Sequence, residues 1–296
     1  MTRVLIAGAS GLIGTRVQDI LRAEGHEVAT LVRRSPAAAH EFEWAPASGH
    51  FPEQALEGVG AVINLSGSSI SKLPWTASRK AEILASRIRA TTTITTAINQ
   101  SSTPPALING SAVGFYGNRP GETLTEESAR GEGFLADVVV DWEAAASGAK
   151  SARTVFLRTG LVFDKSGGAL APLLLATKAF LGSSIGTGEQ YWPWISLEDE
   201  ARAIVHLSVN SALNGPVNLS APAHNTAEEV SRELARQLHR PHLFTLPRFL
   251  LRAGLGTAAD ELLLADQRVS SQRLLDDGFT FTHPTLSSAL ESALRS

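Results

Sequence analysis

Short apolar runs alternate with longer stretches of mixed polarity over the first 160 residues of the chain. The runs at 4–7, 28–32, 61–65 and 154–159 predict buried strands, and so does the run at 107–108, which leads into Asn109, Gly110 and Ser111. Apolar positions at helical spacing predict helices that begin near residue 12, span 76 to about 101, and span 134 to 149. This alternation indicates an α/β fold with a doubly wound parallel sheet.

The pattern becomes less regular after Thr159. Glycines at 167, 168, 182, 186 and 188 surround a predicted helix at 169–180, and capping sequences at 196–199 and 226–229 begin two further helices. A short strand is predicted at 217–219, and helices follow Pro247. We therefore expect a larger domain over 1–165, to which 195–222 returns, and a smaller, mostly helical C-terminal domain over 166–194 and 223–296, which would hold the substrate.

A glycine-rich turn joins the first predicted strand to the first helix. Gly8, Gly11 and Gly14 follow each other at three-residue spacing, and Ser10, Leu12 and Ile13 lie between them. Gly8 would allow a sharp turn, Gly11 a close approach to a pyrophosphate, and Gly14 close packing of helix on strand. The helix N-terminus would bind the phosphates. The order strand, glycine turn, helix predicts a Rossmann-type dinucleotide site, although a plain tight turn remains the alternative.

The second predicted strand ends in Arg33 and Arg34. An acidic residue at this position would bind a ribose 2′-hydroxyl and select NAD, whereas an arginine suits a 2′-phosphate. The chain has no Asp or Glu here, so we predict a preference for NADP(H), with Arg33 facing the phosphate and Arg34 beside it. The alternative is a solvated arginine pair.

Composition limits the remaining classes. The chain has 296 residues, 43% of them hydrophobic, which is enough for a sizeable core. A formal net charge of −3 without a dense basic run disfavours nucleic acid and an anionic membrane as partners. The absence of cysteine excludes disulfides and thiolate chemistry. With no apolar run of membrane-spanning length and the first strand starting near Met1, we expect a cytoplasmic protein without a cleaved leader.

Several motifs together resemble one known family, the epimerase-like atypical short-chain dehydrogenase/reductases. That subgroup is similar to nucleotide-sugar epimerases and ends in a small C-terminal domain of unassigned function. The resemblance covers nearly the whole chain and rests on the segments 8–14, 62–67, 86–87, 111–117, 131–135, 157–160, 267–269 and 278–281.

The resemblance implies roles for individual residues around bound NADP(H). Residues Gly8 to Gly14 would hold the pyrophosphate and Arg33 the 2′-phosphate. Leu65 and Ser66 would lie along the adenosine. Arg87, with Glu82 on the same helix face, would reach back to the cofactor. Ser111 would lie near the nicotinamide, and the stretch from Gly160 to Val162 would approach its carboxamide.

One expected feature of the superfamily is missing. A Tyr-x-x-x-Lys pair normally handles the proton, because the lysine lowers the tyrosine pKa from about 10. The corresponding positions fall near Phe134 and Val138, and neither Tyr116 nor Tyr191 has a lysine four residues later. This departure puts ordinary epimerase or dehydrogenase chemistry in doubt.

Other side chains are candidates to replace the missing pair. Ser111 would bind a substrate oxygen and Tyr116 would donate the proton, or Tyr116 would only pack and bond to the backbone. Asp141 and Glu143 are expected to be solvated helix charges. Gln190, Trp192 and Trp194 would line a substrate pocket or form the core of the second domain.

The leading hypothesis is a cytoplasmic NADP(H)-dependent oxidoreductase acting on a small carbonyl or alcohol. A non-catalytic NADPH-binding sensor is the alternative, and a nucleotide-sugar epimerase is a weaker one. His239 and His242 have no evident ligand partner, so no metal is expected, and the chain has no G-x-S-x-G sequence for a hydrolase. The sequence leaves the oligomeric state undetermined.

Overall fold

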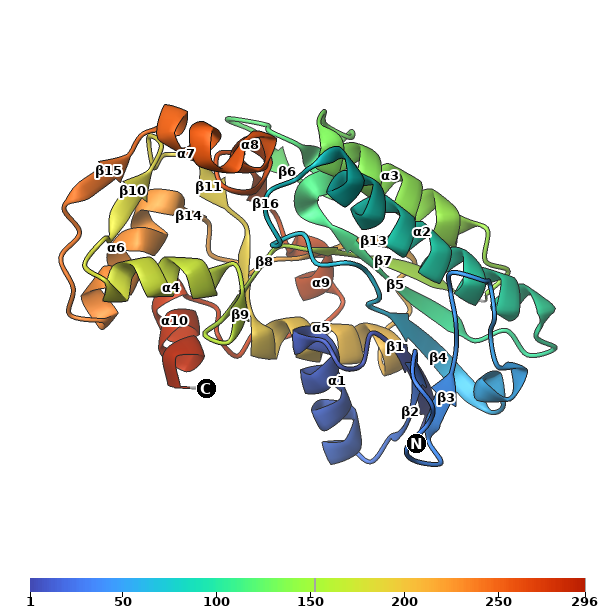
Figure 1. Cartoon of the computed structure of the whole chain (residues 1–296). Coiled ribbons are helices and arrows are strands. Elements are labelled where there is room, and N and C mark those ends of the chain that lie inside the picture. The colour runs from blue at the N-terminus through green and yellow to red at the C-terminus, as the bar shows by residue number, and fades with distance from the viewer. Residues whose placement is uncertain (152, 296) are drawn as a thin grey trace.

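The larger part of the molecule is a parallel seven-stranded sheet with helices on both faces (Figure 1). The computed structural model describes residues 1–151 and 153–295. The sheet has the order β13-β7-β5-β4-β1-β2-β3, and all of its neighbouring strands are parallel. Its strands are β1 (Arg3–Ala7), β2 (Glu27–Val32), β3 (Glu41–Glu43), β4 (Val59–Asn64), β5 (Ala106–Ala112), β7 (Thr154–Thr159) and β13 (Gly215–Leu219). The doubly wound parallel sheet predicted from the sequence is confirmed.

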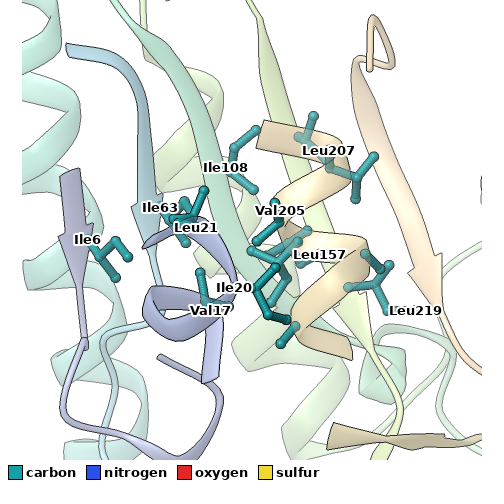
Figure 2. Close-up of a cluster of buried hydrophobic side chains, with 14 of the residues drawn as sticks. Ile6, Val17, Ile20, Leu21, Ile63, Ile108, Leu157, Val205, Leu207 and Leu219 are labelled. Atoms are coloured by element: carbon teal, nitrogen blue, oxygen red, sulfur yellow. The ribbon is translucent and has the colours of Figure 1, made fainter. Parts of the chain in front are cut away.

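Four helices cover the two faces of this sheet. α1 (Leu12–Ala23) and α5 (Leu197–Val209) lie on one face, and α2 (Ala77–Gln100) and α3 (Phe134–Ser147) lie on the other (Figure 1). Successive residues of β1 point to opposite faces, so Val4 and Ile6 join one core cluster and Leu5 and Ala7 another. Figure 2 shows the first cluster, in which side chains of α1 and α5 meet those of the sheet. Burial on both faces explains why these strands are continuous apolar runs.

The remainder of the chain forms a second unit with its own core. Its helices are α4 (Leu170–Lys178), α6 (Ala227–Gln237), α7 (Arg248–Leu255), α8 (Thr257–Leu262) and α10 (Leu286–Arg295), and α9 (Gln272–Asp276) packs back against β13. Short strands accompany them: β8 (Leu161–Asp164), β9 (Gly167–Gly168), β10 (Ser183–Ile185), β11 (Tyr191–Trp192), β12 (Trp194–Ser196), β14 (Asn225–Thr226), β15 (Phe244–Leu246), and the pair β6 (Thr123–Leu124) with β16 (Arg268–Val269). No helix within the described residues is long and apolar enough to cross a membrane.

The sequence located the long helices well and the short strands poorly. The helix predicted at 76–101 is α2, which Thr76 caps through its side chain, and the capping box at Thr226 and Glu229 begins α6. The strands β3, β8 and β12 were missed because each has only three or four residues. Their stability comes from pairing with distant segments, as when Trp194 of β12 pairs with Leu161 of β8.

Candidate functional site

The turn between β1 and α1 has the geometry that its glycines predict. Gly8 has a positive φ of 84°, and a Cβ there would lie 2.7 Å from the carbonyl carbon of Leu65. A Cβ on Gly14 would lie 2.3 Å from the Gly8 oxygen, so the helix packs directly on the turn. Gly8 is therefore required by its backbone conformation, and Gly14 is required because there is no space for a side chain.

The N-terminus of α1 carries no cap of its own. Gly11 is the N-cap residue, no side chain bonds to the first turn, and that turn contains no acidic residue. The first helical residues are Leu12 and Ile13, and Ser10 and Gly11 are exposed just before them. Unsatisfied N–H groups and the positive end of the helix dipole together favour an anion at this position. The cradle fits the pyrophosphate of a dinucleotide.

The end of β4 forms the neighbouring side of this cradle. The Leu65 N–H donates to the Ala7 oxygen over 2.9 Å, and the Ser66 N–H donates to the side chain of Asn64 over 3.2 Å. Asn64 is fully buried, and its amide also bonds to Thr91 and Asn109. This interior network fixes Leu65 and Ser66 beside Gly8, where the family resemblance implies the adenosine side of the cofactor.

The two arginines at the end of β2 differ in their surroundings. Arg33 is exposed and has no hydrogen-bond or ion-pair partner among the described residues. Arg34 makes two hydrogen bonds of 2.8 and 2.7 Å to the carboxylate of Glu41, and these hold the pKa of Glu41 down at about 2. Arg33 is thus available to a phosphate. Arg34 is already engaged, which disagrees with the expectation that it assists Arg33.

Arg87 on α2 lies under the loop that follows β4. Its Nη1 donates to the carbonyl oxygens of Ser68 and Ile83 over 3.0 Å each, and its guanidinium stacks 4.9 Å from the ring of Trp142. Burial, with the charge of Arg79 added, lowers the pKa of Arg87 to about 10. Glu82 is exposed, and a separation of five residues turns it about 140° around the helix from Arg87. The expectation that the two share a face is wrong.

Ser111 belongs to a buried ionic network rather than to an open site. Its hydroxyl donates to Glu143 over 2.6 Å, and Arg158 makes a two-pronged contact of 2.9 and 3.0 Å with the same carboxylate. Glu143 is therefore not the solvated helix charge that was expected, whereas Asp141 is exposed. Burial opposes the charge of Arg158, but its contacts with Glu143 and with the Tyr116 hydroxyl together outweigh this effect, and the pKa of Arg158 is raised. Ser111 must release Glu143 before it can donate to a substrate.

Tyr116 is fully buried in the same network. Its hydroxyl donates to Asn218 over 2.7 Å and accepts from Arg158 over 3.0 Å, and burial raises its pKa. The expected role as proton donor disagrees with this position, because the phenol has no exposed surface and its proton is already bonded. The alternative, a packing tyrosine, describes its surroundings, although its partner is a side-chain amide rather than the backbone.

The positions expected for the Tyr-x-x-x-Lys pair are filled by apolar packing. Phe134 and Val138 lie in a cluster with Trp75 and with Ala258 of α8, so the second unit covers the start of α3. Glu261 of α8 then accepts hydrogen bonds from the backbone N–H groups of Phe134 (3.1 Å) and Leu135 (2.6 Å). A carboxylate from the second unit thereby caps α3.

Four further candidate residues are buried in the structure. Trp192 and Trp194 are 3% and 0% exposed and belong to the core of the second unit, as does Phe163, which stacks on Trp194. Gln190 is also buried and donates to the Ile185 and Leu263 oxygens. The core interpretation of these three residues is the one that holds. Val162 is buried in β8, and its contact with a carboxamide stays a prediction.

Sequence reasoning missed the roles of Arg158 and Glu261. Each of these charges acquires its role from a partner that is distant in the chain, for example Glu261 from Phe134, 127 residues away. The only local signal was Arg158, a charge inside an otherwise apolar strand. No group of three or more His, Asp or Glu side chains that could hold a metal occurs in 1–151 and 153–295.

Comparisons with known proteins match nearly the whole length of the chain. The NAD dependent epimerase/dehydratase family matches residues 4–219, and a domain of unknown function, DUF1731, matches residues 246–293. The epimerase family protein Mb2239 of Mycobacterium bovis is 42% identical over 97% of this chain and 96% of its own. The epimerase family protein SDR39U1 of Homo sapiens is 33% identical over 98% of each chain.

Two solved structures are similar over 99% of this chain. One is human SDR39U1 crystallised with NADPH, with 31% identity, a TM-score of 0.89 and 99% of that chain covered. The other is a nucleoside-diphosphate sugar epimerase from Corynebacterium glutamicum, with 31% identity and a TM-score of 0.82 over 58% of that longer chain.

Proposed function

The chain belongs to the NAD dependent epimerase/dehydratase family, and on that premise we propose that it is an NADP(H)-dependent oxidoreductase acting on a small carbonyl or alcohol. The observation that carries the proposal is the uncapped N-terminus of α1 inside the glycine cradle, one strand away from the unpartnered Arg33. The first feature suits a pyrophosphate and the second a 2′-phosphate. The NADPH-bound human relative supports this choice of cofactor.

Different residues of this chain would bind different parts of NADP(H). The glycine cradle with Ser10, Leu12 and Ile13 would hold the pyrophosphate, and Arg33 would bind the 2′-phosphate. Leu65 and Ser66 would lie along the adenosine. The bound nicotinamide supplies or accepts the hydride. The protein has to orient the substrate beside it and exclude water, and the second unit over α3 is suited to both tasks.

Proton transfer is the step in which this chain differs from ordinary reductases. Phe134 and Val138 cannot exchange a proton, and Tyr116 donates to Asn218. Ser111 remains the candidate for binding the substrate oxygen, provided that its hydroxyl exchanges Glu143 for the substrate. We expect slow turnover, because general acid catalysis typically contributes 10²–10⁴-fold.

Fluorescence titration of the purified chain with NADPH and with NADH tests the cofactor assignment. We expect NADPH to bind at least about tenfold more tightly, because a charge-assisted phosphate contact is worth about 1.5–3 kcal/mol. Arg33→Ala should abolish the difference by weakening NADPH binding alone. Arg34→Ala is the matched control, since Glu41 already holds that side chain. Equal affinities in the parent protein would contradict the proposal.

A second candidate, a non-catalytic NADPH-binding sensor, is favoured by one observation. The place of the proton-transferring pair is packed with apolar side chains beneath α8. NADPH oxidation with a panel of carbonyl compounds separates the two candidates. Turnover with any of them supports the oxidoreductase, whereas NADPH binding without turnover, together with an NADPH-dependent change in affinity for a protein partner, supports the sensor. Nucleotide-sugar epimerisation is weaker, because it needs the acid–base pair that this chain lacks.

A further inference from the structure

Tyr191 points to the opposite side of β11 from the tryptophan that follows it. Trp192 packs into the core of the second unit, and successive residues of a strand point to opposite faces. Tyr191 is partly exposed, and its hydroxyl has no hydrogen-bond partner among the described residues. A phenol with a free hydroxyl therefore lies beside the aromatic core that the sequence suggested as a substrate pocket.

Two further polar side chains lie near Tyr191. The guanidinium carbon of Arg268, on β16, is 5.5 Å from the centre of the Tyr191 ring. β11 pairs with β14 so that Tyr191 is opposite Thr226, and His224 directly precedes β14. Because alternate residues of a strand share a face, His224 lies on the same face of this strand pair as Tyr191. Three chain segments thus bring together a phenol, an imidazole and a guanidinium group.

No carboxylate balances the charge of this cluster. Arg268 is exposed and forms no ion pair within 1–151 and 153–295, and the ring of His224 has no hydrogen-bond partner there. Burial, with the charge of Arg268 added, lowers the pKa of His224, so the ring is neutral at neutral pH and carries one N–H donor. The carboxylate of Asp266 accepts from the Tyr191 N–H over 2.9 Å. Three side chains that can donate, one of them a cation, are complementary to an anion.

Arg268 is fixed to the loop that follows β5. The side-chain amide of the neighbouring Gln267 donates to the oxygens of Val113 (3.0 Å) and Gly117 (2.8 Å), which lie just beyond the end of that strand. On the other side of Arg268, Val269 packs with Val113 in a small core cluster. Both neighbours of Arg268 therefore hold β16 at the carboxyl end of β5.

His224 is brought to the same edge of the sheet by β13. It lies shortly after Leu219, the last residue of β13, and the Leu219 oxygen accepts from the Gly160 N–H over 2.9 Å. Gly160 follows β7 and begins the stretch that the family resemblance places near the nicotinamide carboxamide. Open parallel sheets bind ligands at the carboxyl ends of their strands. The cluster therefore lies between the main sheet and the second unit, where Figure 1 shows β16 and β11.

We propose that Arg268, Tyr191 and His224 form a binding site for an anionic group of the substrate, a carboxylate or a phosphate. The guanidinium fork would bind two oxygens of the anion, and the phenol and the imidazole would each donate one hydrogen bond. The phosphates of the cofactor are expected beyond β1 and β2, on the other side of the sheet from β13. The inference rests on the proposed function, because it assigns the anion to the carbonyl or alcohol that exchanges hydride with NADP(H).

Calorimetry on the full chain saturated with NADPH tests the site, with inorganic phosphate and malonate as probes. We expect one probe to bind the parent protein, and Arg268→Gln to weaken that binding at least about tenfold, because a charge-assisted contact is lost. Tyr191→Phe and His224→Phe should each weaken it about fivefold, since each removes one neutral donor. The probe that binds identifies the class of anion.

Arg240→Gln is the matched control. Arg240 also stacks on an aromatic ring, 4.5 Å from the centre of Phe180, but it follows α6 on the side of the second unit that is remote from the sheet (Figure 1). This change should leave the affinity for the probe unchanged. Equal losses in Arg240→Gln and Arg268→Gln would overturn the inference, as would full affinity in Arg268→Gln.

Fluorescence titration of the same variants with NADPH separates the possible failures. Unchanged NADPH affinity with anion binding lost in Arg268→Gln supports the site. A parent protein that binds NADPH but neither probe overturns the inference and leaves the proposed function standing. Lost NADPH affinity in Arg268→Gln would assign this arginine to the cofactor and also overturn the inference. Anion binding that depends on Arg268 in a chain without affinity for NADPH would refute the proposed function and leave the site standing.

Pairs of aldehydes that differ in one anionic group give a second measurement. Succinic semialdehyde is compared with butanal, and glyceraldehyde 3-phosphate with glyceraldehyde, in NADPH oxidation. For a pair that is turned over, Arg268→Gln should raise KM for the charged aldehyde at least about tenfold and leave KM for the neutral one unchanged. Equal increases in KM for both members of the pair would overturn the inference.

Discussion

At the scale of single residues, partners decide what each side chain can do. Ser111, Tyr116 and Glu143 occupy positions that suggest catalysis, but their polar atoms already bond to each other through Arg158 and to Asn218. Arg33 looks like an ordinary surface cation, yet it is the one of the adjacent pair that no carboxylate holds. Chemical type alone therefore did not reveal that these buried groups already have partners.

Replacing Tyr116 by Phe should lower stability and leave NADPH affinity unchanged. The substitution strands the buried Asn218 oxygen and one donor of Arg158, which costs about 1–3 kcal/mol. Urea unfolding followed by circular dichroism measures this loss. Tyr191→Phe is the matched control, because the Tyr191 hydroxyl makes no hydrogen bond to a described residue and its loss should cost little. A normal stability combined with lost reductase activity would restore the proton-donor role.

At the scale of elements, the helix N-termini differ in whether another part of the protein caps them. α1 leaves its N-terminus open, whereas α3, which begins after Gly133 without a cap of its own, receives the carboxylate of Glu261 from α8. Of these two helices, only α1 therefore leaves room at its N-terminus for an anion from outside the protein. The open N-terminus of α1 was predictable from the glycine spacing. The cap of α3 was not, because Glu261 is 126 residues from Leu135.

Replacing Glu261 by Ala should destabilise the contact between the two units. The change removes two hydrogen bonds and a charge from the N-terminus of α3, worth about 1–2 kcal/mol together. Thermal unfolding of the variant measures the loss. The neighbouring Asp260→Asn change is the control, since Asp260 only pairs with Arg252 near the surface and should cost less than about 1 kcal/mol. Equal losses in the two variants would argue against the cap.

At the scale of the whole molecule, the packing of α5 on the sheet buries a carboxyl group. Glu200 is 0% exposed, one of its oxygens accepts from the Thr159 hydroxyl over 2.7 Å, and the other has no partner. Burial raises the pKa of Glu200 to about 8, so the folded chain holds a proton that the unfolded chain releases near pH 4.5. This stabilisation is complete below about pH 4.5 and is lost as the pH rises through 8.

Glu200→Gln should therefore flatten the dependence of stability on pH. Between about pH 5 and 8 the parent protein should lose up to about 1.4 kcal/mol per pH unit relative to the variant, because one proton leaves on unfolding. Urea unfolding of both proteins at several pH values gives the two slopes. Parallel slopes would mean that Glu200 is already ionised in the folded state.

The features that could be predicted from the sequence alone were local ones. The alternation of apolar runs and helices predicted the parallel sheet, because strands buried on both faces and helices with one apolar face leave direct periodic signals. The cradle from Gly8 to Gly14 was equally predictable, since the residues that shape it are contiguous. Long elements and contiguous motifs need no knowledge of distant partners.

The surroundings of the polar candidate residues came from the tertiary packing alone. It buried Tyr116 beside Asn218, engaged Ser111 with Glu143, and covered Phe134 with α8. Each outcome depends on segments tens to more than a hundred residues apart. Burial and pairing decide whether a polar group can still bind a ligand. Both depend on the packed structure rather than on the residues adjacent to that group in sequence.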